Sequence, residues 1–100
     1  MSVDNILHEA SAVLHAALRY STEFSETDKI DHHIYRMRVL ITRVAAHSYT
    51  TLGDDANISA ELRELQDLKD VVLKTAEQRF GSTSMMLSEF RYPRNQMPSS

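Results

Sequence analysis

The chain has 100 residues, no cysteine, 42% apolar residues, 25% charged residues and a formal net charge of −3. A chain of this length has room for one hydrophobic core. The lack of cysteine excludes disulfides, thiol catalysis and cysteine-rich zinc sites. No apolar run approaches the ~20 residues of a membrane span, and the N-terminus lacks the basic and apolar regions of a secretory signal. The sequence therefore favours a single cytoplasmic domain that does not contact a membrane.

Two glycines and two prolines are too few for a protein with several hairpins, so the fold class is predicted to be all-α. Apolar residues recur at spacings of three and four, which indicates amphipathic helices. The helices are predicted at about residues 3–20, 27–52, 58–80 and 84–91, in one helical domain over residues 1–92. Residues 93–100 are predicted to form a flexible tail.

Several residues mark where these helices begin and end. Ser25 and Asp28 have the spacing of a capping box, with aspartate in place of glutamate. Gly53 and Gly81 stand where a left-handed residue ends a helix. A helix over residues 27–52 would be ~37 Å long at ~1.5 Å per residue. We therefore expect an elongated antiparallel three-helix bundle with a short fourth C-terminal helix.

The second predicted helix has two apolar stripes, whose centres are roughly 140° apart at 3.6 residues per turn. The first consists of Ile30, Ile34, Met37, Ile41, Val44 and Ser48. The second consists of Tyr35, Val39, Thr42, Ala46 and Tyr49. A three-helix bundle leaves one stripe uncovered. The second stripe then either faces water, or receives a different protein, or forms the interface of a homodimer, which is the prediction made here.

A basic ridge of Lys29, Arg36, Arg43 and His47 runs for ~27 Å along the same helix. Such a ridge could bind an acidic protein or follow a phosphate backbone. The acidic residues of segment 58–80 could instead neutralise it within the chain. A nucleic-acid partner is possible but less favoured than a protein, because no aromatic residues interleave with the arginines as stacking platforms.

Two further features bear on packing and binding. Met85, Met86 and Phe90 are the most apolar residues outside the main stripes, and they either cover the open end of the bundle or anchor a partner. Lys69 interrupts the stripe of the third helix. Its ammonium either extends to water or meets a carboxylate across a helix interface and fixes the register.

Catalytic and metal-binding patterns are weak. The five histidines form neither a Glu-x-x-His nor a His-Glu-x-x-His motif. The chain has no Gly-x-Ser-x-Gly elbow and no phosphate-binding glycine loop. The sequence therefore predicts no enzyme activity, no metal and no cofactor. The function predicted is a non-enzymatic protein–protein interaction module, such as an adaptor, inhibitor, regulator or chaperone. The alternative is a nucleic-acid-binding regulatory protein that uses the basic ridge.

Overall fold

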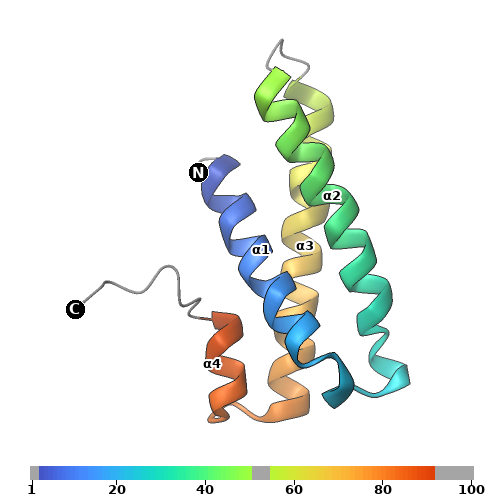
Figure 1. Cartoon of the computed structure of the whole chain (residues 1–100), viewed down its shortest axis with the longest axis vertical. Helices are drawn as coiled ribbons and strands as arrows, with labels where there is room; N and C mark the ends of the chain where they lie inside the picture. Colours follow the sequence, from blue (N-terminus) through green and yellow to red (C-terminus); the bar gives the residue numbers. More distant parts are fainter. Residues whose placement is uncertain (1–2, 51–54, 92–100) are drawn as a thin grey trace, which may run out of the picture.

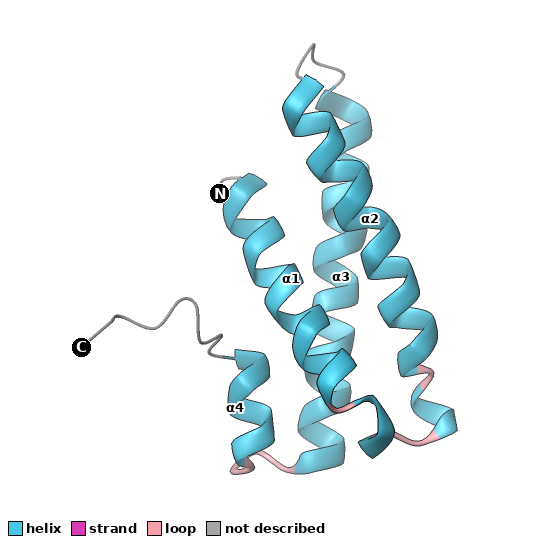
Figure 2. Cartoon of the chain, in the orientation of Figure 1, coloured by secondary structure: helices cyan, strands magenta, loops and turns pink. Residues whose placement is uncertain are grey.

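The computed structural model describes the backbone of residues 3–50 and 55–91 and the side chains of residues 3–47 and 58–91. Within these ranges the chain is helical and contains no strand, which confirms the all-α prediction (Figures 1 and 2). The elements in chain order are α1 (Val3–Arg19), the 3₁₀ turns η1 (Ser21–Glu23) and η2 (Glu26–Asp28), α2 (Ile30–Thr50), α3 (Asp55–Phe80) and α4 (Met85–Arg91).

The predicted helix starts need two corrections. The capping pair at Ser25 is present, since the Ser25 backbone N–H donates to Asp28 Oδ2 at 2.9 Å, but it opens the short turn η2. Lys29 then takes a left-handed φ of 54°, so α2 begins at Ile30 instead of residue 27. A left-handed residue cannot continue a right-handed helix. The third helix begins at Asp55, one turn earlier than predicted.

The other ends match the sequence closely. Gly81 has a φ of +87° and ends α3, and its N–H donates to the Glu77 carbonyl oxygen at 2.8 Å. Ser84 caps α4, because its Oγ accepts a hydrogen bond from the Met86 N–H at 3.1 Å. The predicted stop at Gly53 and the predicted tail 93–100 lie outside the described residues.

Helices α1, α2 and α3 run up and down beside one another, and α4 turns back along the C-terminal ends of α1 and α3 (Figure 1). The Cα radius of gyration is 14.1 Å, slightly above the ~13 Å of a compact domain of this length. No helix among residues 3–50 and 55–91 combines the length and the apolar character needed to cross a bilayer.

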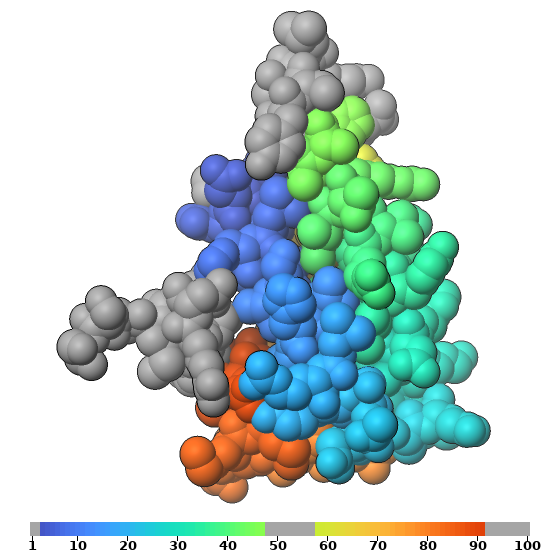
Figure 3. Space-filling view, in the orientation of Figure 1, coloured from blue at the N-terminus to red at the C-terminus, as the bar shows by residue number. Residues whose placement is uncertain are grey.

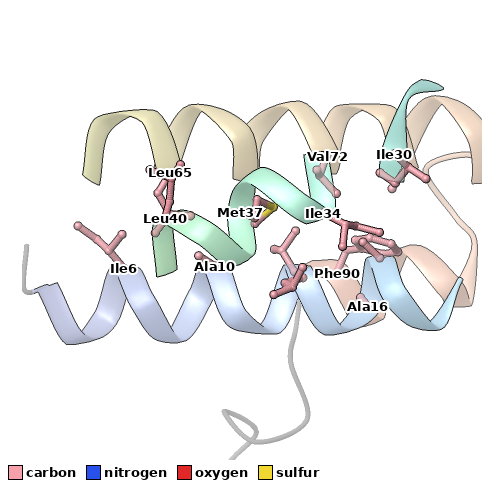
Figure 4. Close-up of a cluster of buried hydrophobic side chains, with 14 of the residues drawn as sticks. Ile6, Ala10, Ala16, Ile30, Ile34, Met37, Leu40, Leu65, Val72 and Phe90 are labelled. Carbon is pink, nitrogen blue, oxygen red and sulfur yellow. The ribbon is translucent and has the colours of Figure 1, made fainter. Parts of the chain in front are cut away.

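The core lies where the four helices meet, and Figure 4 shows its side chains converging between α1, α2 and α3. Met37 and Leu40 of α2 meet Leu65 and Val72 of α3 there, and all four are fully buried. Ala10 and Ala17 of α1 are also fully buried. Small residues at these positions let α1 approach its neighbours closely. Of the predicted first stripe of α2, Ile30, Ile34, Met37 and Val44 are buried, Ile41 is half-buried, and the Ser48 side chain lies outside the described residues. Leu40, which the stripe did not include, is also fully buried.

An aromatic cluster closes the end of the bundle where α1, α3 and α4 meet. Phe80 contacts Tyr20, Phe24 and Phe90 at ring-centroid distances of 6.2, 5.2 and 6.1 Å. The Tyr20 hydroxyl donates to Glu89 of α4, and Arg19 forms an ion pair with the same carboxylate. The ring contact between Tyr20 and Phe90 also joins the end of α1 to α4, and an aromatic pair adds about 0.5–1.5 kcal/mol beyond its buried area. Together these contacts hold α4 against α1.

Lys69 lies between α3 and α1. Its Nζ is 3.4 Å from Glu9 Oε1, and the lysine side chain is only 18% exposed. The lysine therefore meets a carboxylate across a helix interface within the chain, which was one of the two outcomes expected from the sequence. Such a pair favours one register of α1 on α3.

Candidate functional site

The side of α2 opposite the core carries the second apolar stripe. Tyr35 and the buried Val44 are nine residues apart, which places them about 180° apart around the helix. Tyr35, Thr42 and Ala46 are exposed and Val39 is half-buried. These four residues are called the outer α2 face below. Tyr49 was predicted to belong with them, but its side chain lies outside the described part of the structure.

Figure 3 shows that this helix forms one edge of the molecule, with α1 beside it and α4 on the far side of the bundle. The outer α2 face lies on the side of α2 opposite its buried residues. It was predicted as a homodimer interface, and its four described residues share one accessible surface. What covers that surface stays a prediction.

A shallow hollow lies in the N-terminal half of this face. It is open to solvent, has a volume of about 510 Å³ and is lined by Asp31, Ile34, Tyr35, Arg38 and Val39. Ile34 is buried and supplies an apolar floor, whereas Tyr35 is 68% exposed. Tyrosine is among the residues enriched at the centres of protein interfaces, because its ring buries a large area while its hydroxyl can stay wet. The hollow is the part of the face best suited to accept a side chain from another molecule.

Opposite charges flank the exposed tyrosine. Asp31 lies four residues before Tyr35 and Arg38 lies three residues after it, and both are exposed. Neither side chain forms an ion pair with any other residue that the structure describes. Neither residue is among the predicted site residues, although their seven-residue spacing around Tyr35 is visible in the sequence alone.

The basic ridge faces α3. Arg36 makes a bidentate contact with Glu64, with Nε and Nη2 at 2.6 and 2.9 Å from the two carboxylate oxygens. These hydrogen bonds raise the pKa of Arg36 and lower the pKa of Glu64. Arg43 lies 4.0 Å from Glu61. The acidic residues of α3 therefore neutralise the middle of the ridge, which was one of the outcomes left open from the sequence.

The two ends of the ridge differ from its middle. Lys29 is the left-handed residue between η2 and α2, and its side chain is exposed. His47 is half-buried and has an interaction partner within the chain. The four ridge residues thus do not form one uninterrupted positive surface. Their role as a partner site stays a prediction.

The C-terminal residues predicted as a partner anchor divide into two groups. Met85 is 85% exposed and Met86 is half-buried, but Phe90 is only 2% exposed. Phe90 packs against the aromatic cluster and belongs to the core. Its buried position contradicts the prediction that it binds a partner. The apolar spacing of this segment could not show which of its side chains face inward, because α4 has only seven residues.

His33 is the one histidine with a distinctive environment among the described residues. Its Nδ1 atom is buried and has no hydrogen-bond partner there. Burial lowers the pKa of His33, and the neighbouring His32 and Lys29 lower it further. Over the described ranges, no group of three histidine or carboxylate side chains is arranged to hold a metal ion.

No protein-family model, curated protein or solved structure matches this chain. The outer α2 face and its hollow are the candidate binding site of the described residues.

Proposed function

We propose that this protein is a non-enzymatic, cytoplasmic protein–protein interaction module, and that the outer α2 face binds another protein chain, in the first instance a second copy of itself. The observation that carries the proposal is the exposure of Tyr35, 68%, beside an apolar-floored hollow and opposite the core. Covering a large aromatic side chain in this position with a partner lowers the free energy of the complex, because apolar surface is removed from water.

A second copy is favoured over a different protein for two general reasons. Twofold homodimers are the commonest oligomers of soluble proteins. A single core in a chain of this size also has little stability to spare, so covering an extra apolar face helps the folded state.

Nucleic-acid binding is the alternative, and the ridge contacts argue against it. Arg36 and Arg43 are already paired with α3 carboxylates, so binding phosphates would require breaking these pairs. A phosphate-binding protein would show a log affinity that falls linearly with log salt concentration. We expect a fluorescence anisotropy titration with short duplex DNA or single-stranded RNA to give no such salt-dependent binding.

The direct test is the solution mass measured by light scattering over a dilution series. One chain has a mass of 11.4 kDa, so a dimer has twice that mass. We expect the wild type to approach the dimer mass at high concentration and Tyr35→Glu to stay monomeric. Met85→Glu is the matched control, because Met85 is also a large exposed apolar residue but lies on α4. It should associate as the wild type does.

Each outcome has a definite meaning. A wild-type mass of one chain at every concentration would contradict self-association. If Met85→Glu dissociates the dimer and Tyr35→Glu does not, the interface lies on α4 and the assignment to the outer α2 face is wrong. Circular dichroism of both variants checks that they remain folded.

A further inference from the structure

The charges beside Tyr35 are self-complementary. Asp31 and Arg38 are seven residues apart on α2, which separates them by about 10.5 Å along the helix axis. That separation is two helical turns, with the Tyr35 side chain between them, so the two charges do not pair within one helix. Both line the same hollow. They are therefore placed to pair with charges supplied from outside the chain.

A second copy supplies these charges in only one orientation of α2 against α2. In a parallel arrangement, Asp31 would meet Asp31 and Arg38 would meet Arg38, and like charges in contact are destabilising. In an antiparallel arrangement with the twofold axis between Ile34 and Tyr35, residue 31 of one copy is level with residue 38 of the other. Each aspartate then meets an arginine, and the pair forms twice because a twofold interface repeats every contact.

We infer that two copies of this chain pair antiparallel through the N-terminal half of α2, with the twofold axis between Ile34 and Tyr35 and with Asp31 of each copy paired to Arg38 of the other. The inference rests on the proposed function and specifies the register of that interface. The two Tyr35 rings lie beside the axis, each over the hollow of the opposite copy. The two exposed Tyr35 rings provide the apolar contact, and the two ion pairs enclose it.

This register differs from one centred on the whole outer α2 face. An axis at Thr42 would place Arg38 level with Ala46 and Asp31 level with Gly53, so neither charge would have a partner of opposite sign. An axis between Ile34 and Tyr35 gives Asp31 and Arg38 partners of opposite charge and places the hollow at the centre of the interface. It leaves Ala46 roughly 17 Å from the axis, at the margin of the contact.

Charge reversal tests the register directly. We expect Arg38→Asp to weaken dimerisation at least ~10-fold, because it places two aspartates opposite each other. Asp31→Arg should do the same with two arginines. An equimolar mixture of the two variants should form a heterodimer, since every contact then joins an aspartate to an arginine. The double variant carrying both changes in one chain should recover the homodimer.

Matched controls come from α3, where Lys74 and Asp70 are exposed. Lys74→Asp and Asp70→Arg make the same changes of charge away from α2 and should leave the dimer intact. Ala46→Glu should also leave it intact in this register. Analytical ultracentrifugation measures all of these species, and circular dichroism confirms that each variant is folded.

The results separate this inference from the proposed function. If Tyr35→Glu dissociates the dimer but the mixture of charge variants stays monomeric, self-association through the outer α2 face stands and the register is wrong. If Ala46→Glu dissociates the dimer and the two reversals do not, the axis lies nearer Thr42 and the register is again wrong. A monomeric wild type would overturn both the register and the homodimer.

Discussion

Replacing Phe90 by alanine should strongly destabilise the fold. Phe90 is 2% exposed and contacts Tyr20, Phe24 and Phe80. It is also one of two buried residues of α4, the other being Leu87. Removing its ring leaves a cavity in the aromatic cluster and takes away half of the apolar anchor that holds α4 on α1 and α3.

The size of the effect follows from the buried area. A phenylalanine side chain buries roughly 150–250 Å², which at about 25 cal/mol per Å² corresponds to roughly 4–6 kcal/mol. Truncation to alanine retains the Cβ atom, and Phe→Ala changes in cores cost about 3–5 kcal/mol. We therefore expect a loss of about 4 kcal/mol. For a domain of this length, that lowers the Tm by roughly 15–30 °C.

Thermal and urea unfolding followed by circular dichroism measure this loss. Met85→Ala is the control, because Met85 belongs to the same short helix but is 85% exposed, and its free energy of unfolding should change by less than about 0.5 kcal/mol. Equal, small losses in the two variants would refute the reasoning. They would mean that α4 does not dock on the bundle in solution and that Phe90 is available to a partner after all.

Two further predictions concern charged groups. A double-mutant cycle on Arg36→Ala and Glu64→Ala should give a small favourable coupling free energy that shrinks at high salt, since the side chains are 37% and 44% exposed; a coupling near zero at low salt would contradict the bidentate pair. Because the pKa of His33 is lowered in the folded state, the unfolded chain binds more protons below about pH 6.5, and stability should fall as the pH decreases through that value. In urea unfolding, His33→Gln should remove this part of the pH dependence, whereas the control His15→Gln should retain it. An unchanged pH profile in His33→Gln would contradict a lowered pKa of His33 in the folded state.

The sequence predicted the helices well because helix formation depends on local patterns. The spacing of Val13, Ala17 and their neighbours defined α1 to within one residue, and Gly81 and Ser84 placed the end of α3 and the start of α4. The start of α2 was predicted one turn too early, at residue 27 instead of Ile30. The capping pair at Ser25 is real, but the left-handed Lys29 separates it from α2, and no side-chain pattern announces a positive φ at a lysine.

Periodicity also placed Tyr35 and Thr42 on a face away from the core, because residues three and four apart share one side of a helix whatever surrounds it. It could not say which neighbour each face meets. The angle at which α3 lies on α2 decides that Arg36 meets Glu64, and the turn at Gly81 decides that Phe90 faces inward while Met85 faces water. A helical pattern fixes directions around one axis, whereas contacts between helices depend on how several axes pack around a shared core. The hollow beside Tyr35 and the charges that flank it become a candidate interface only once that packing leaves them exposed on the outside of the bundle.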